Sequence, residues 1–193
     1  ETNLLWTRYL VILAAVALLV LATMWLERRE VVKGRNEQRR QILFGIGVIA
    51  FFASIPYFYD GMVSGADLTY HLHRIEGVKD GLLTGQFPVR LEPRWVFDHG
   101  YANGIFYCNL LLYFPALLRM AGFTMTESYA FYCIGLNIAT AAIAWYCFNG
   151  IFGDRIIGLV CSALYTLSIF RFFKLVMVGA VGEGSAYTFL PLV

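Results

Sequence analysis

Charged residues are scarce in this sequence, where Asp, Glu, Lys and Arg make up only 15% of 193 residues. Soluble domains usually carry about a quarter of such residues. The shortage argues against an ordinary soluble domain. The net charge of +2 is also too small to indicate a nucleic-acid-binding protein, so we expect no nucleic-acid partner.

Sharp motifs for metal or nucleophile chemistry are also missing. The four cysteines form no CxxC pair and no Cys/His ligand spacing, which indicates neither a disulfide framework nor a zinc site. We find no Ser/His/Asp triad motif and no metalloprotease motif. Gly179 to Gly184 (GAVGEG) lacks the Lys-Ser/Thr ending and the preceding strand of a phosphate-binding loop. Any chemistry must therefore come from looser groups of polar residues.

Long apolar runs are abundant. Hydrophobic residues make up 59% of the chain, and its mean hydropathy is +0.64. Runs of this length predict helices that cross a bilayer. We expect spans over Leu4–Leu26, Ile42–Tyr59, Tyr129–Phe148 and Ile156–Phe173, and the start of another at Val176. The predicted fold class is an all-α integral membrane protein.

The orientation follows from a short basic loop. Glu27 to Arg40 holds six Lys/Arg against three Glu, and such loops lie on the cytoplasmic side. Residues 1–41 are thus expected to form a transmembrane helix and a cytoplasmic loop. Residues 60–128 would form an extracytoplasmic loop within a second part, 42–193. Because the chain starts at Glu1 and stops inside an apolar run, we expect a fragment of a longer, many-helix protein.

The apolar segment 106–122 is too short for a regular span of about 20 residues. Pro115 interrupts its middle, and Arg119 lies near its end. We therefore expect an interfacial helix inside the outer loop. With that topology, Arg171, Glu183 and Asp67 all face outward.

A polar stretch from Asp60 to Gly104 is where a site is expected. It holds all three histidines, six of the thirteen acidic residues and four of the fifteen basic ones. Helical spacing over Asp67 to Leu83 predicts a surface helix that rests on the membrane by an apolar stripe. A neighbouring stripe brings together a carboxylate, an imidazole and a guanidinium, namely Asp67, His71 and Arg74.

Two interpretations of Asp67 stand side by side. It can act as a general base or metal ligand beside basic partners. It can also mark the helix start, because Ser64 and Asp67 have capping-box spacing and helix caps are common. His71 is likewise more often a helix-surface residue than a ligand. The three residues together indicate a site more strongly than any one of them.

Six further residues are candidates for substrate binding, and each has an ordinary structural interpretation. Arg90 and Arg94 could grip phosphate in a turn-rich segment, or simply be solvated at the surface. His99 and Tyr107 could bind a sugar, although aromatic residues are also normal at membrane interfaces. Arg171 and Glu183 are ionisable groups at predicted membrane ends and so functional candidates, but Arg171 could only be snorkelling.

These segments also resemble a known family. DLTYHLHRIEG (67–77) and GLLTGQFPVR (81–90) resemble bacterial polytopic membrane proteins of the YfhO-like kind, some labelled "6-pyruvoyl-tetrahydropterin synthase-related". The shorter pieces GYA (100–102), LYFPA (112–116) and FLPL (189–192) are similar too. The resemblance covers roughly residues 42–193. The pterin label finds no support in a membrane chain of this kind.

That group is similar to the GT-C superfamily of membrane glycosyltransferases. The resemblance implies a transmembrane helix bundle with a helical first extracytoplasmic loop, in a bacterial cell membrane. It implies a polyprenyl-phosphate-linked sugar as donor and an extracytoplasmic glycan or lipid as acceptor. Asp67 matches the family's acidic residue, which acts as base or binds a divalent cation, with His71 and Arg74 tuning it. Arg90, Arg94 and Arg171 would contact phosphate.

Two features depart from the family pattern. Leu68 follows Asp67, so the Asp-Glu pair of several branches is absent, and the Leu4–Leu26 helix precedes the usual first helix. Other classes of function also remain open. Polar groups between helices would suit a transporter or flippase of a lipid-linked substrate, provided that helices are broken at mid-membrane. A non-catalytic membrane subunit would use the polar stretch only to bind a partner.

Overall fold

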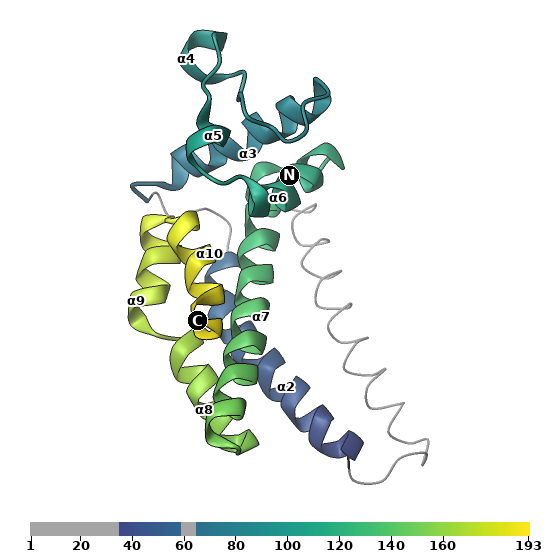
Figure 1. Cartoon of the computed structure of the whole chain (residues 1–193), viewed down its shortest axis with the longest axis vertical. Helices are drawn as coiled ribbons and strands as arrows, with labels where there is room; N and C mark the ends of the chain where they lie inside the picture. Colours follow the sequence, from purple (N-terminus) through teal and green to yellow (C-terminus); the bar gives the residue numbers. More distant parts are fainter. Residues whose placement is uncertain (1–34, 59–64) are drawn as a thin grey trace. The chain divides into compact units, whose positions relative to one another are not determined.

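The structure is a computed structural model, and it describes residues 35–58 and 65–193 (Figure 1). The predicted Leu4–Leu26 helix, most of the basic loop, Asp60 and Ser64 lie outside the described residues. The chain divides into two compact units, Glu1–Gly45 and Ile46–Val193. The second unit contains the sites considered below.

Within the described residues, two helices are long and apolar enough to cross a membrane. α2 (Arg35–Ser54) continues through η1 (Ile55–Phe58), and the candidate span Asn36–Phe58 has a mean hydropathy of 1.8. α7 (Met125–Phe152) has 28 residues and a mean hydropathy of 1.5. The first candidate span begins six residues before the predicted span Ile42–Tyr59. The second extends beyond the predicted span Tyr129–Phe148 at both ends. The prediction of membrane-spanning helices is thus supported by length and composition.

The start of α7 is set by local sequence. The Thr124 side chain accepts a hydrogen bond from the Glu127 backbone, and the Glu127 carboxylate accepts one from the Thr124 backbone. This capping box satisfies two donors that a helix start leaves without partners. At the other end, Gly153 takes a left-handed conformation with φ of 67°. The helix therefore ends there and α8 can turn back.

The span predicted over Ile156–Phe173 is not one continuous helix. α8 (Arg155–Thr166) is followed by a break, then by α9 (Ile169–Phe172) and the π-helical turn η3 (Phe173–Val178). The two parts are bent by 42°. Arg171 Nη1 donates a hydrogen bond to the Thr166 carbonyl oxygen over 3.3 Å. The arginine side chain thus supplies a donor to a backbone carbonyl at the break. If the bent pair is counted as one span, the described residues contain three candidates.

The chain then turns into α10 (Val181–Phe189) and η4 (Leu190–Leu192), which pack against α7. Val176 lies inside η3, and the nine-residue α10 is not among the candidate membrane spans of the described residues. Gly179, with φ of 73°, separates η3 from α10. This turn brings the beginning of α10 next to the beginning of α3.

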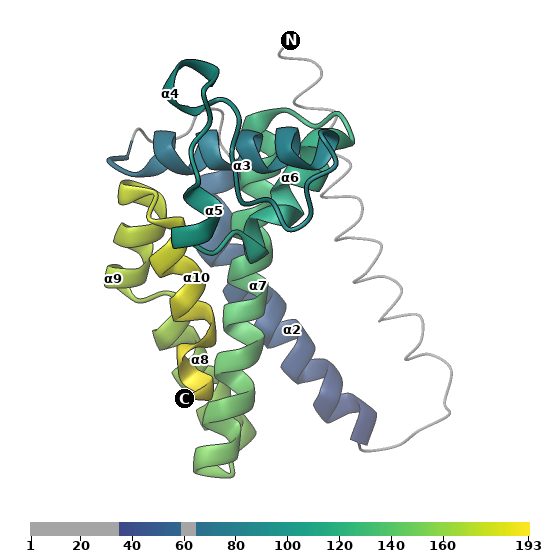
Figure 2. The same ribbon diagram turned by 45° about the horizontal axis from the view of Figure 1, so that its top comes forward.

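Residues 65–123 form what we call the head. It contains α3 (Leu68–Leu83), the short helices α4 (Trp95–Asp98) and α5 (Asn103–Phe106), η2 (Leu110–Leu112) and α6 (Tyr113–Met120). α3 lies crosswise to α7, and α4 lies at the end of the head away from α8 (Figures 1 and 2). The predicted helix Asp67–Leu83 is confirmed to within one residue.

The segment predicted as an interfacial helix is broken up. Its longest helical part, Leu110–Met120, is shorter than the candidate spans, so it does not cross a bilayer as a regular helix. One buried core joins this part to α3 and α7, with members Leu68, Ile75, Val78, Val89, Leu112, Ala116, Tyr129, Tyr132, Cys133 and Leu136. Apart from an isolated bridge between Glu92 and Tyr101, residues 35–58 and 65–193 contain no β-structure. The all-α prediction is confirmed for them.

Candidate functional site

Asp67 occupies an exposed position at the first turn of α3. It is the N-cap residue, but its side chain makes no capping hydrogen bond. Its backbone N–H donates to the Val178 carbonyl oxygen over 3.0 Å. A Cβ on Gly65 would lie 2.3 Å from that oxygen, and one on Gly179 would lie 2.8 Å from Leu68 Cβ. Two glycines thus permit the close contact that fixes Asp67 beside the η3–α10 turn.

His71 lies one turn further along α3 and is buried, with an exposed fraction of 3%. Its Nδ1 atom is 3.4 Å from Nη1 of Arg74. Because a guanidinium can only donate, this geometry assigns Nδ1 as acceptor and places the imidazole proton on Nε2. Burial and the nearby charge of Arg74 lower the pKa of His71 to about 4, although the Asp67 carboxylate opposes this. His71 is therefore neutral near pH 7.

Arg74 is the centre of a buried polar network. Its Nη2 atom donates to the Cys108 carbonyl oxygen over 3.0 Å and to Asn109 Oδ1 over 2.5 Å. Its guanidinium also lies 4.1 Å from the ring centroid of Tyr107. Burial lowers the pKa of the Arg74 guanidinium, and the Glu92 carboxylate opposes this change. Arg74 thus ties α3 to the segment around Tyr107 and is inaccessible to a substrate from solvent.

Glu92 is the acidic partner in this network and is fully buried. Its Oε1 atom lies 4.0 Å from Arg74 Nε, and its Oε2 atom accepts a hydrogen bond from Trp95 Nε1 over 2.6 Å. Asn103 and Asn109 amides complete the shell at 3.4 Å. Burial raises the pKa of Glu92, although the hydrogen bond from Trp95 opposes the rise. Sequence analysis missed Glu92 because it lies in a turn-rich segment without helical periodicity.

Tyr107 and Glu183 lie near the beginning of α10, as does Lys174, which sequence analysis did not select. Lys174 Nζ is 2.9 Å from Glu183 Oε2. A Cβ on Gly182 would lie only 1.8 Å from the Tyr107 hydroxyl, so the ring packs directly on the α10 backbone. The only sequence signal for Lys174 is a cation in an apolar run, three residues after Arg171. Asp67, His71, Tyr107 and the Lys174–Glu183 pair thus lie around the contact between the start of α3 and the η3–α10 turn.

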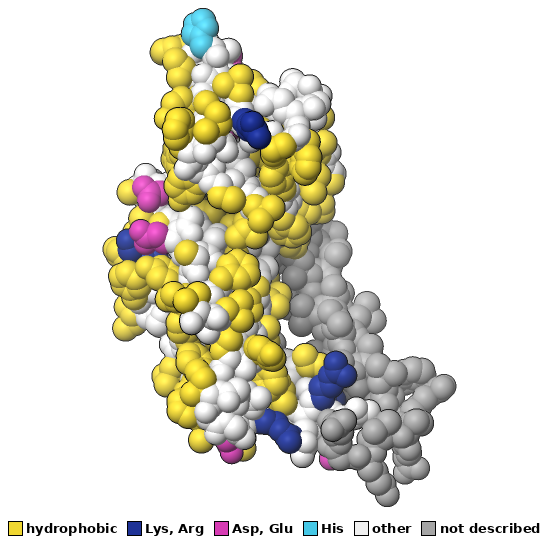
Figure 3. Space-filling model, in the orientation of Figure 1, with side chains coloured by type: hydrophobic (Ala, Val, Ile, Leu, Met, Phe, Trp, Pro, Cys, Tyr) yellow, Lys and Arg dark blue, Asp and Glu magenta, His cyan; other side chains and the backbone are white. Residues whose placement is uncertain are grey.

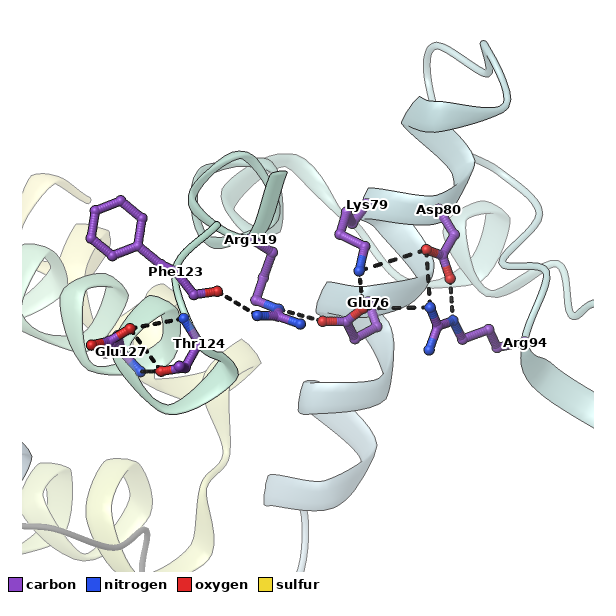
Figure 4. Close-up of polar contacts among 8 residues, drawn as sticks. All are labelled: Glu76, Lys79, Asp80, Arg94, Arg119, Phe123, Thr124 and Glu127. Carbon is purple, nitrogen blue, oxygen red and sulfur yellow. Dashed lines mark hydrogen bonds and ion pairs between the residues drawn. The ribbon is translucent and has the colours of Figure 1, made fainter. Parts of the chain in front are cut away.

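Arg94 belongs to a different group on the outer side of α3. Figure 4 shows Arg94 joined to Asp80 and Glu76, while Arg119 and Lys79 also reach Glu76. The hydrogen bond to Asp80 raises the pKa of Arg94. Burial alone would raise the pKa of Glu76, but hydrogen bonds from Lys79 and Arg119 lower it. This group joins α3 to α6 through Arg119 and to the loop after α3 through Arg94. Arg94 is therefore already paired.

Arg90 and His99 are both exposed. Within the described part of the chain, the Arg90 side chain has no hydrogen-bonding or ionic partner. His99 follows three residues with positive φ, namely Val96 at 55°, Phe97 at 54° and Asp98 at 65°. A left-handed turn without glycine costs about 1–2 kcal/mol per residue. The structure does not bring Arg90 or His99 into contact with Asp67.

Arg171 lies in the interior, with an exposed fraction of 4%. It donates to Asn137 Oδ1 over 2.8 Å and to Thr140 Oγ1 over 2.9 Å, both on α7. Asn137 is about 18 Å along α7 from its first residue. No carboxylate in residues 35–58 and 65–193 pairs with this guanidinium. The predicted outward-facing phosphate contact is therefore not the arrangement that the structure shows.

The predicted divalent cation finds no ready site among the described residues. No three His, Cys, Asp or Glu side chains come together there as metal ligands. A metal role for Asp67 stays a prediction, since it would need ligands from substrate, water or other parts of the protein.

Comparisons with known proteins add no identification. No protein-family model matches the chain, and no curated protein or solved structure is significantly similar to it.

Proposed function

We propose that this chain is the N-terminal part of a membrane glycosyltransferase of the GT-C type, acting outside the cytoplasm of a bacterial cell. In this proposal a polyprenyl-phosphate-linked sugar is the donor, and a cell-surface glycan or lipid is the acceptor. The observation that supports it is an exposed Asp67 carboxylate that makes no capping hydrogen bond and lies beside a buried, neutral His71. Both residues belong to a head that packs on a candidate membrane span.

The chemistry assigned to Asp67 is general-base catalysis. Its carboxylate takes the proton from the acceptor hydroxyl while that oxygen attacks the anomeric carbon. The bond from the anomeric carbon to the phosphate oxygen breaks, and its electron pair leaves with the phosphate. His71 and Arg74 act as positioning residues, because both are buried and Arg74 fixes the His71 tautomer. Lys174 and Glu183 lie at the edge of this site.

The test is sugar transfer by the full-length protein in proteoliposomes supplied with labelled polyprenyl-phosphate sugars. Asp67→Asn should lower turnover by a factor of about 100 to 10,000, as expected for loss of a general base. Its melting temperature should stay near that of the unaltered protein, because Asp67 is exposed. Asp98→Asn is the matched control, since Asp98 is also exposed and lies on α4. Equal losses in both variants would remove Asp67 from the mechanism.

A second candidate function is transport of a lipid-linked substrate, and one specific observation favours it. The bent pair α8–α9 is interrupted between Thr166 and Ile169, and the buried Arg171 of α9 donates a hydrogen bond to the Thr166 carbonyl oxygen at this break. Broken helices with buried charges are typical of transporters. This function predicts movement of the lipid across the bilayer without chemical change. A lipid-scrambling assay separates the two functions. Transport predicts scrambling that is lost in Arg171→Met, whereas the glycosyltransferase proposal predicts sugar transfer that is lost in Asp67→Asn.

A further inference from the structure

The head exposes an apolar face that its own core does not cover. On the helical segment Leu110–Met120, Leu110, Phe114 and Leu117 recur at a spacing of three or four residues and are all exposed. The opposite side of this segment is buried against the core through Leu112 and Ala116. One side of the segment thus belongs to the protein interior, and the other is apolar and uncovered.

Neighbouring segments extend this face. Phe87 and Phe106 have exposed fractions of 80% and 81%. The Phe87 ring lies 5.7 Å from that of Tyr113, on the same short helix as Phe114. We call the apolar face the set Phe87, Ile105, Phe106, Leu110, Phe114 and Leu117. An exposed apolar surface of this kind marks an interaction site.

Arg90 is the cation attached to the apolar face. Its carbonyl oxygen accepts a hydrogen bond from Gly104 N over 3.2 Å, which places it next to Ile105. Its side chain is exposed and free of partners among the described residues. Arg94, by contrast, is already paired with Asp80. Among residues 35–58 and 65–193, no partner occupies the Arg90 guanidinium at the apolar face.

The position of the apolar face relates it to a candidate membrane span. α6 packs against α7, and only four residues separate Met120 from Met125, where α7 begins. α5 and α6 lie on the side of the head toward α7, whereas α4 lies on the far side (Figures 1 and 2). Figure 3 shows that apolar side chains also cover most of the visible surface below the head. The apolar face thus belongs to the part of the head that packs against this candidate span.

We propose that the apolar face lies in the headgroup region of the bilayer, with the Arg90 guanidinium on a lipid phosphate. Aromatic side chains are enriched at this depth, and an arginine there binds phosphate while its stem packs on apolar groups. The proposal goes beyond the proposed function and does not depend on catalysis. A lipid is the chosen occupant because the apolar face sits where a candidate span begins and carries the Arg90 guanidinium.

Photocrosslinking of the full-length protein in lipid nanodiscs tests this placement. Benzoylphenylalanine would replace Phe106 or Phe114, and Phe97 would be the matched control. Phe97 has an exposed fraction of 96% but lies on α4, on the far side of the head. We expect at least about tenfold more lipid adduct at Phe106 and Phe114 than at Phe97. Equal yields at the three positions, or crosslinks to protein instead of lipid, would overturn the proposal.

The role of Arg90 is tested in nanodiscs that mix phosphatidylglycerol with phosphatidylcholine. One arginine near a membrane surface should enrich the anionic lipid about fivefold among adducts at Phe106. Arg90→Gln should return the adducts to the bulk lipid ratio, whereas Arg94→Gln should leave the enrichment unchanged. Enrichment that survives Arg90→Gln, or that falls equally with Arg94→Gln, would overturn the phosphate contact. Inorganic phosphate added to the buffer should not compete, because the site takes phosphate at the bilayer surface.

Discussion

Acidification should destabilise the head through His71. The pKa of His71 falls from 6.5 to about 4 in the folded protein because of burial and the charge of Arg74. The folded state thus favours the neutral imidazole, and the unfolded chain binds a proton first as the pH drops. The stabilisation is fully present above pH 6.5 and is lost as the pH falls from 6.5 toward 4.

The magnitude follows from linkage between the two pKa values. Going from about pH 7 to about pH 5 should lower the free energy of unfolding by roughly 2 kcal/mol through this one group. For a unit of this size, that corresponds to a fall in melting temperature of roughly 4–8 °C.

The assay is thermal unfolding at a series of pH values, comparing the unaltered protein with His71→Asn. Asn keeps an acceptor near Arg74 but does not titrate, so the variant should lose this pH dependence. Glu92 acts in the opposite direction, since its raised pKa adds stability as the pH falls. That contribution is common to both proteins and cancels in their difference. His73→Gln, at an exposed position on α3, is the control.

Identical pH profiles for the unaltered protein and His71→Asn would refute this reasoning. A loss of the pH dependence in His73→Gln would refute it as well, because that imidazole is exposed.

Three other substitutions test the packing around the site. Arg74→Met should lower the free energy of unfolding by about 3–5 kcal/mol, since it leaves Glu92 buried without its cation. Glu92→Gln leaves the buried Arg74 without its carboxylate, so chemical denaturation should show a loss of similar size. Gly182→Ala should cost about 1–3 kcal/mol by overlap with the Tyr107 hydroxyl, and Tyr107→Phe in the same chain should restore part of it in thermal melts. Thr124→Ala removes the capping box of α7 and should lower stability by about 1 kcal/mol, measured the same way. A loss from Gly182→Ala that is unchanged by Tyr107→Phe would contradict the contact.

Local signals in the sequence were enough for several elements. Helical spacing over Asp67–Leu83 predicted α3, and run length predicted the candidate spans in α2 and α7. Pro115 and the short apolar run showed that 106–122 does not cross a bilayer as a regular helix. These features depend on residues within a few positions of one another, so the order of residues alone reveals them.

The candidate site was only partly predictable. The sequence stripe joined Asp67, His71 and Arg74, and the structure places all three on or at the start of α3. The sequence stripe did not reveal that His71 and Arg74 are buried while Asp67 is exposed. That difference arises because residues 89–109 fold back over α3 and supply Glu92 and Asn109.

The order of residues was enough to predict an all-α chain with candidate membrane spans, the helix α3 and the polar stretch that contains Asp67, His71 and Arg74. Which of these polar groups face solvent depends on tertiary contacts, because hydrogen-bond partners of Arg74 lie 33 to 35 positions away along the chain. The same holds for Arg171, whose contacts with Asn137 and Thr140 remove it from the predicted phosphate site. Burial of a charge depends on contacts between distant segments, and no local pattern encodes them.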